Sequence, residues 1–205
     1  MVEITNVKVY ELMESVIASR NAMRLTPPEY TAEEVLASFK RATTLAHAKS
    51  GSGHDNWLKG VRVSFDIKYP GYFSPELQRY NFIDIVTSAS KMHRLIQMNM
   101  DACFNEYVTQ EAKDMMKRYI AEYNLVCETG DKEDIYHAFM KVISNCPYGI
   151  ELFMRCSTNY LQLKTIYSQR KHHKLKEDWG AFCDMIKGLP YANELITFEK
   201  QDDNT

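Results

Sequence analysis

The chain has 205 residues, of which 45% are hydrophobic and 25% charged, and its formal net charge at neutral pH is −2. These values are typical of one folded domain with a sizeable core. They argue against a disordered chain and disfavour general electrostatic binding of nucleic acid, although a local basic patch could hold one phosphate. No apolar run approaches the ~20 residues of a membrane span, and we expect no signal peptide. The five cysteines are widely spread and include no C-x-x-C pair, which indicates reduced thiols in a cytoplasmic protein and no metal site.

The first third of the chain predicts one strand and two helices. Residues 4–12 alternate apolar and polar side chains, which favours a short strand. Residues 14–24 have a helical pattern that the prolines at 27–28 end. Thr31 and Glu34 form a capping box for a second helix, and the glycines that follow should end it.

The clearest strand lies at residues 61–69, where apolar and polar side chains alternate strictly. Because a slip of one residue would expose the whole apolar set, we predict that one set of five faces the core: Val61, Val63, Phe65, Ile67 and Tyr69. The other set faces the opposite side: Arg62, Ser64, Asp66 and Lys68. Ser74 and Pro75 have the form of an N-cap and a first helical residue, which predicts a helix from Pro75 to about Phe82. The pattern of residues 83–92 decides neither for a helix nor for a strand.

The second half of the chain is helical except for one strand. Residues 109–127 predict a long helix, and Asp131 caps the next one. The period returns to two over residues 150–156, which predicts a strand. Helical patterns then run to Arg170 and again around Trp179.

Together these elements predict one helix-rich α+β domain over residues 1–198, with a small, mostly antiparallel sheet and a polar tail at 199–205. The sequence contains no glycine-rich dinucleotide motif, Walker loop, zinc-protease motif or nucleophile elbow. His172 and His173 are adjacent on a helix end, so their side chains diverge and do not suit one metal ion. No catalytic residue and no metal ligand follows from motifs alone.

Several polar clusters could bind a ligand, and each also has a purely structural interpretation. The loop at residues 51–56 brings glycines beside a histidine, which lets backbone amides approach a ligand, but it also suits a helix end. Arg79 has the fork geometry for phosphate, yet Glu76 beside it makes an ordinary surface pair. Residues 87–91 could form a phosphate nest or a polar turn. Residues 167–174 form a basic helix end that either is solvated or binds an anion.

The order of these pieces resembles that of the flavin-dependent thymidylate synthases. In this chain Gly53 and His54 stand where that family has its flavin-contacting Gly-His pair, and Arg79 stands where the signature RHRxxSxNExSxRY begins. The helix that ends at Arg170 resembles the family's nucleotide-binding arginine helix. The resemblance implies an FAD site formed by His54, Asn56, Asn81 and Gln169. It also implies a site for a pyrimidine nucleotide such as dUMP formed by Arg79, Ser88, Ser90, Lys91 and Arg170.

The resemblance further implies that a one-carbon unit is transferred to C5 of a uridine nucleotide with reduced flavin, in a homo-oligomer that we expect to be a tetramer. We predict that Arg79 and Arg170, although far apart in sequence, converge on one anion-binding pocket, with the other three nucleotide-binding candidates nearby.

The signature departs from the family pattern in its charges. Tyr80 and Asn81 replace a histidine and an arginine, and Glu76 stands where the family has glutamine. A phosphate would lose charge-assisted hydrogen bonds worth about 1.5–3 kcal/mol each. Either the ligand differs, or residues 164–174 supply the missing charge. Three interpretations stay open: a flavoenzyme, a relative that binds a nucleotide or protein without redox chemistry, and a helical interaction protein.

Overall fold

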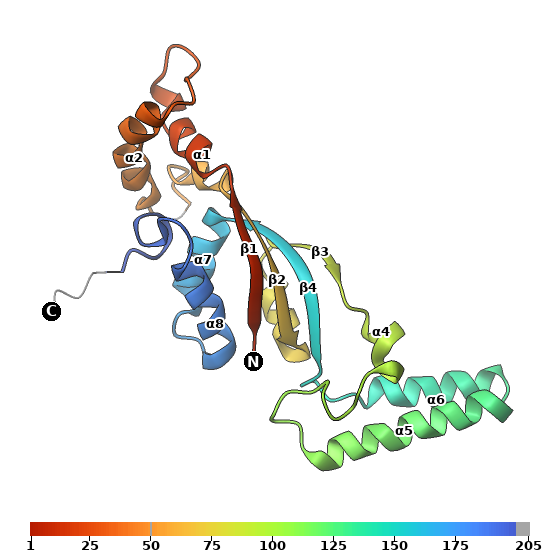
Figure 1. Ribbon diagram of the computed structural model, residues 1–205. Helices are drawn as coiled ribbons and strands as arrows, with labels where there is room; N and C mark the ends of the chain where they lie inside the picture. Colours follow the sequence, from red (N-terminus) through yellow and green to blue (C-terminus); the bar gives the residue numbers. More distant parts are fainter. Residues whose placement is uncertain (50, 200–205) are drawn as a thin grey trace.

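A four-stranded antiparallel sheet forms the centre of the protein (Figure 1), in a computed structural model that describes residues 1–49 and 51–199. In spatial order the strands are β1 (Glu3–Tyr10), β2 (Arg62–Pro70), β4 (Glu151–Asn159) and β3 (Asp84–Ser88). Each neighbouring pair runs antiparallel. The predicted α+β fold with a small antiparallel sheet is confirmed. Of the predicted polar tail, residues 200–205 lie outside the described residues.

The side chains of strand β2 alternate between a buried face and a polar face of the sheet. The five side chains predicted to face the core are at most 4% exposed: Val61, Val63, Phe65, Ile67 and Tyr69. On the neighbouring strand, Cys156 pairs with Phe65 and Met154 pairs with Ile67, and both are buried in the same core. The alternation predicted from the sequence is therefore confirmed, because the register between β2 and β4 keeps both apolar sets on one side.

Two C-terminal helices, α7 (Tyr160–Arg170) and α8 (Lys176–Lys187), cover the buried face of the sheet (Figure 1). Trp179 and Phe182 of α8 are fully buried, and the Phe182 ring meets the ring of Phe65 edge-on with centroids 5.7 Å apart. Burial of such a side chain stabilises the fold by about 1.5–3 kcal/mol. From α7 in this layer, Lys164 and Arg170 reach other parts of the chain.

Helices α1 (Leu12–Ala18) and α2 (Ala32–Ala46) pack together beyond one end of the sheet (Figure 1). Half of the predicted capping box forms, since the amide of Glu34 donates to Thr31 Oγ1 at 3.2 Å. The Glu34 carboxylate accepts from Arg20, Arg24 and Ser38 instead of returning to the Thr31 amide. The first helix was predicted over residues 14–24, but α1 ends at Ala18 and a 3₁₀ turn follows it (η1, Asn21–Met23). The Ser19 hydroxyl donates to the carbonyl of Val16 at 2.7 Å and so competes with continued helix formation.

The segment after β2 also corrects a prediction. The helix expected from Pro75 to about Phe82 is a single turn, α3 (Ser74–Leu77), and Ser74 is its first residue while Phe73 is the N-cap. After Leu77 the chain forms a turn, in which the amide of Tyr80 donates to the carbonyl of Leu77 at 3.1 Å. Further on, the carbonyl of Phe82 accepts a hydrogen bond from Thr158 Oγ1 of β4 at 2.8 Å. The undecided segment that follows contains the edge strand β3. The remaining short helical elements are η2 (Asn56–Lys59), η3 (Gly71–Phe73), α4 (Lys91–Arg94), η4 (Leu95–Gln97) and η5 (Asn193–Thr197).

Helices α5 (Gln110–Thr129) and α6 (Lys132–Ser144) form a hairpin that projects from the other end of the sheet (Figure 1). Asp131 caps α6 as predicted, because its carboxylate accepts from the amides of Glu133 and Asp134 at 2.8 and 3.0 Å. A second, smaller core joins the hairpin to the sheet, with Met116, Val142, Leu95, Phe104 and Ile150 buried in it. In the part of the chain that the structure describes, no helix is long and apolar enough to cross a membrane.

Candidate functional site

The Gly-His loop between α2 and β2 presents polar groups at the surface. Gly51 and Gly53 have φ angles of +84° and +82°, in the left-handed region that side chains larger than hydrogen disfavour. His54 and Asn56 are exposed, and within the described residues neither side chain has a hydrogen-bond or ion-pair partner. The loop therefore offers a histidine and an amide that the fold itself does not use.

Lys164 of α7 binds residues of this loop and of the segment before it. Its Nζ lies 2.7 Å from Asp55 Oδ2 and donates to the carbonyls of Ala46 at 2.6 Å and Ala48 at 3.1 Å. An ammonium group has three donors, so all of them are used. The two charged side chains are only 9% and 2% exposed. Lys164 thus fixes the loop to α7 and does not supply charge to an external anion.

Arg170 at the far end of α7 is held by residues of the segment that follows β2. Its Nη1 lies 3.0 Å from Glu76 Oε2, and its Nε donates to the Tyr80 hydroxyl at 2.6 Å. That hydroxyl donates in turn to Gln169 Oε1 at 3.0 Å. The guanidinium also lies over the Trp179 ring, 4.7 Å from its centroid. The Arg170 guanidinium therefore makes polar contacts at Nη1 and Nε and packs its face on Trp179, and the side chain is 11% exposed.

Two further basic groups face the same carboxylate. Arg79 Nη2 is 3.9 Å from Glu76 Oε1, and His173 Nε2 is 3.9 Å from Glu76 Oε2. His173 Nδ1 accepts a hydrogen bond from the amide of Leu175 at 3.2 Å, which places the proton of the neutral ring on Nε2, toward Glu76. Arg79 and Arg170 thus meet at one anion, and that anion is the chain's own Glu76.

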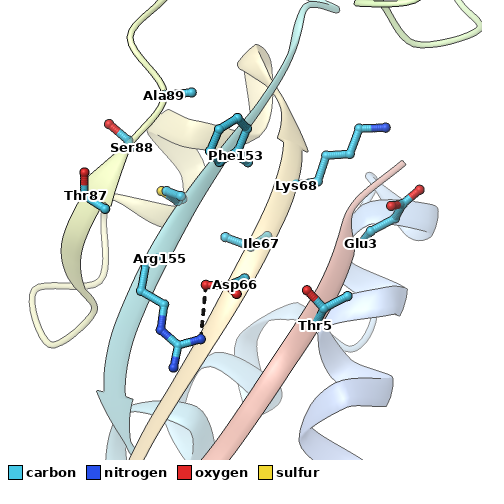
Figure 2. Close-up of a pocket in the computed structure, with 11 residues that line it drawn as sticks. Glu3, Thr5, Asp66, Ile67, Lys68, Thr87, Ser88, Ala89, Phe153 and Arg155 are labelled. Atoms are coloured by element: carbon cyan, nitrogen blue, oxygen red, sulfur yellow. Dashed lines mark hydrogen bonds and ion pairs between the residues drawn. The ribbon is translucent and has the colours of Figure 1, made fainter.

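The polar face of the sheet contains a cavity of about 480 Å³ between β1 and β3 (Figure 2). Arg155 crosses its floor, with Nη1 3.1 Å from Asp66 Oδ1 and Nη2 donating to Ser64 Oγ at 2.8 Å. Hydrogen bonds from Asn6 and from Arg155 hold the pKa of Asp66 below its ordinary value. Ser88 lines the wall that β3 contributes.

The remaining predicted nucleotide-binding residues lie apart from the two arginines. Ser90 caps α4 by accepting from the amide of His93 at 3.3 Å, and Lys91 is the first residue of that helix. Among the described residues, no hydrogen bond or ion pair joins Ser88, Ser90 or Lys91 to Arg79 or Arg170. Arg170 lies on the helix-covered side, beside Trp179, whereas Ser88 lines the cavity on the polar face. Asn81 is exposed directly after Tyr80.

Sequence reasoning missed the Arg155–Asp66 pair. The alternation of residues 61–69 and 150–156 assigns both side chains to the polar face, but only the pairing of β2 with β4 sets them opposite each other. It also missed Asp55, which stands within the predicted loop but is buried.

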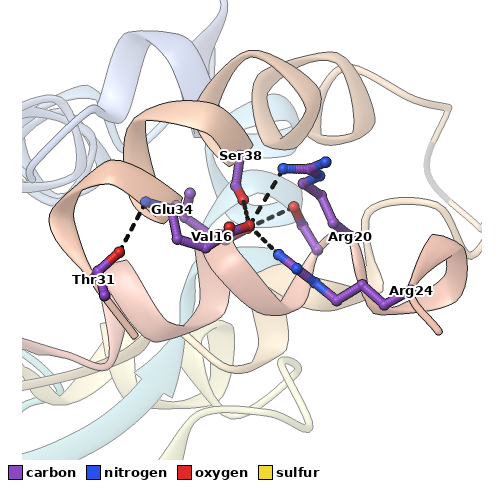
Figure 3. A network of polar contacts seen from close by, with 7 residues as sticks. Val16, Arg20, Arg24, Thr31, Glu34 and Ser38 are labelled. Carbon is purple, nitrogen blue, oxygen red and sulfur yellow. Dashed lines mark hydrogen bonds and ion pairs between the residues drawn. The ribbon is translucent and has the colours of Figure 1, made fainter. Parts of the chain in front are cut away.

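A separate polar cluster joins α1 to α2 (Figure 3). Glu34 Oε1 accepts hydrogen bonds from Arg24, from Arg20 Nη1 at 3.3 Å and from Ser38 Oγ at 3.2 Å. The hydrogen bond from Arg24 is the main reason that the pKa of Glu34 lies below its ordinary value. The cluster ties the turn after α1 to the first turns of α2, which is a structural role.

Comparison with known proteins relates this geometry to a fold. No protein-family model and no curated protein sequence matches the chain. Two structures of the flavin-dependent thymidylate synthase ThyX from Helicobacter pylori with FAD and dUMP superpose with TM-scores of 0.61 and 0.62, at 13% and 14% identity. They cover 97% of this chain and 97% and 96% of their own. The UMP/dUMP methylase PolB from Streptomyces cacaoi bound with 5-Br dUMP gives a TM-score of 0.60 at 13% identity, over 96% of this chain and 91% of its own.

The chain has the fold of the flavin-dependent thymidylate synthases. The resemblance in the order of elements is therefore confirmed at the level of the fold, over nearly the whole chain. Identities this low relate folds and do not transfer a reaction.

Proposed function

We propose that the protein is a divergent thymidylate synthase-like enzyme that transfers a one-carbon unit to C5 of a uridine nucleotide, with reduced flavin, in the cytoplasm. The observation that carries this proposal is the thymidylate synthase fold, shared over nearly the whole chain with structures that contain FAD and dUMP. A methylase bound to a dUMP analogue shares the same fold. All these neighbours bind a uracil nucleotide, which favours a pyrimidine ligand for this chain.

The Gly-His loop fits the requirements of a flavin site. A Cβ at Gly51 would meet no atom within 4 Å, so the backbone is open to close approach there. We assign His54 and Asn56 to hold the polar edge of FAD, together with Asn81 and Gln169. The Tyr80 hydroxyl occupies the Gln169 oxygen, which leaves the amide nitrogen of Gln169 as a donor. Bound in reduced form, the flavin supplies the hydride that the methyl transfer requires.

For the nucleotide we assign Arg79, Arg170, Ser88, Ser90 and Lys91. Because Ser88, Ser90 and Lys91 do not meet the two arginines within one chain, we propose that the site is completed between subunits of a homo-oligomer, a tetramer. Light scattering checks this point: a monomer of about 24 kDa at micromolar concentration would contradict it.

The decisive experiment is the visible absorption spectrum of the purified protein, followed by titration of FAD and dUMP. We expect flavin absorbance, and weaker FAD binding in His54→Ala than in the wild type. The matched control is His137→Ala, which removes an exposed histidine from the distant helix α6. Absence of FAD binding, together with no binding of dUMP at millimolar concentration, would reject the proposal.

A second function is favoured by one observation at the signature. Tyr80 and Glu76 engage Arg170, so the chain itself occupies a group that the proposed enzyme would use on a nucleotide. The alternative is a relative of this fold that binds a nucleotide or a protein partner without redox chemistry. The same titrations identify the nucleotide-binding form of this alternative, because such a relative would bind a pyrimidine nucleotide but no flavin.

A further inference from the structure

We infer that Glu76 is a specificity-determining residue that keeps a phosphate group from binding Arg170, so that the site does not distinguish a uridine nucleotide from a uridine nucleoside. The inference rests on the proposed function, since it concerns the same pyrimidine site. It selects one of the two outcomes that the altered signature leaves open, namely that the ligand differs.

The first argument is that groups of the chain itself already bind Arg170. Nη1 of Arg170 lies 3.0 Å from Glu76 Oε2, and Nε donates to the Tyr80 hydroxyl at 2.6 Å. The Trp179 ring covers the guanidinium face. Only 11% of the Arg170 side chain is exposed. A phosphate would have to displace the Glu76 carboxylate to take its place on Nη1, and the charge-assisted bond it gained would replace one of the same kind.

The second argument is that the neighbouring cations do not compensate. Lys164 is committed to Asp55 in the interior, and it uses all its donors there. Arg79 is 71% exposed and lies on the other oxygen of Glu76, at 3.9 Å. Two arginines that share one carboxylate leave a single net positive charge, against the double negative charge of a phosphate monoester. Of the stretch at residues 164–174, Lys164 therefore does not replace the charges that Tyr80 and Asn81 remove, and Arg170 and His173 both face Glu76.

The third argument concerns hydrogen-bond chemistry. A carboxylate and a phosphate dianion are both acceptors without a proton to donate, so Glu76 repels a phosphate at short range. A nucleoside hydroxyl carries a proton and donates to a carboxylate. Glu76→Gln keeps the size and the acceptor oxygen, removes the charge and adds an NH₂ donor. The substitution should therefore convert the same position into one that binds phosphate.

The test is calorimetric titration of dUMP, deoxyuridine and inorganic pyrophosphate into the wild type, Glu76→Gln, Glu76→Ala and the double variant Glu76→Gln with Arg170→Met. We expect the wild type to bind dUMP and deoxyuridine within about threefold of each other, and Glu76→Gln to bind dUMP about tenfold more tightly, with deoxyuridine unchanged. The gain should disappear in the double variant. Glu133→Gln removes one exposed carboxylate from α6 and controls for net charge.

The inference is overturned if the wild type prefers dUMP over deoxyuridine by about tenfold or more, or if neither variant at Glu76 changes that ratio. Glu76→Ala keeps the test open should Glu76→Gln fold poorly. If no uracil ligand binds any variant, the proposed function fails, and pyrophosphate decides the inference by itself. Pyrophosphate binding to Glu76→Gln but not to the wild type supports it, and equal or absent binding to both overturns it.

Discussion

Lys164→Met tests how the Gly-His loop is held in place. The substitution keeps an unbranched side chain of similar length but removes the ammonium group. Asp55 would then be a carboxylate with 2% of its side chain exposed and without its ion-pair partner. The carbonyls of Ala46 and Ala48 would lose their donor at the same time.

The structure sets the expected size of the effect. Removal of one partner from a buried ion pair costs about 3–5 kcal/mol, because the other charge stays buried without compensation. A domain is stable by about 5–15 kcal/mol, so this loss is a large share of the total. The double variant Lys164→Met with Asp55→Asn should lose less than the sum of the two single variants, since it leaves no uncompensated charge.

The measurement is urea unfolding followed by tryptophan fluorescence, with Lys171→Met as the control. Lys171 is an exposed lysine directly after α7, so its replacement should change the free energy of unfolding by less than about 0.5 kcal/mol. Trp57 reports locally, because it lies in η2 of the same loop. Equal free energies of unfolding for the two methionine variants, or additive effects in the double variant, would refute the account of the Lys164 anchor.

Three further predictions concern stability and reactivity. Phe65→Ala should lower the free energy of unfolding by about 3–5 kcal/mol in urea titrations, because Phe65 is fully buried between the sheet and α8; a loss below about 1 kcal/mol would contradict its place in the core. The pKa of Glu34 is held below its ordinary value of 4.5, chiefly by Arg24, so its contribution is complete above pH 4.5 and is lost as the pH falls through the lower, folded-state pKa. Unfolding measured across the acidic range should therefore depend less on pH in Glu34→Gln, and an unchanged dependence would refute this. Alkylation at mildly alkaline pH, read by mass spectrometry, should modify exposed Cys127 before Cys156, whose pKa burial raises to about 12; the reverse order would contradict the burial.

Local pattern was sufficient for the elements whose signals lie in neighbouring residues. The alternation of residues 61–69 determined both a strand and its buried face, because the side-chain period of a strand leaves one choice of core side. The caps at Thr31 and Asp131 were readable because a capping side chain bonds amides two or three residues away. The helix after Ser74 was predicted too long, since residues beyond Leu77 make contacts with distant parts of the chain, such as the hydrogen bond from Thr158 to Phe82.

The candidate site was only partly readable for the same reason. The sequence singled out His54, Arg79 and Arg170 by their type and order, but not what each of them touches. Glu76 binds Arg170, and Asp55 binds Lys164, because the sheet brings distant segments together, and no local period records such pairs. The sequence by itself determined the fold class and the chemical groups available. Only the tertiary structure decided which charges neutralise one another, because Coulomb attraction and desolvation depend on distance and burial in space rather than on position along the chain.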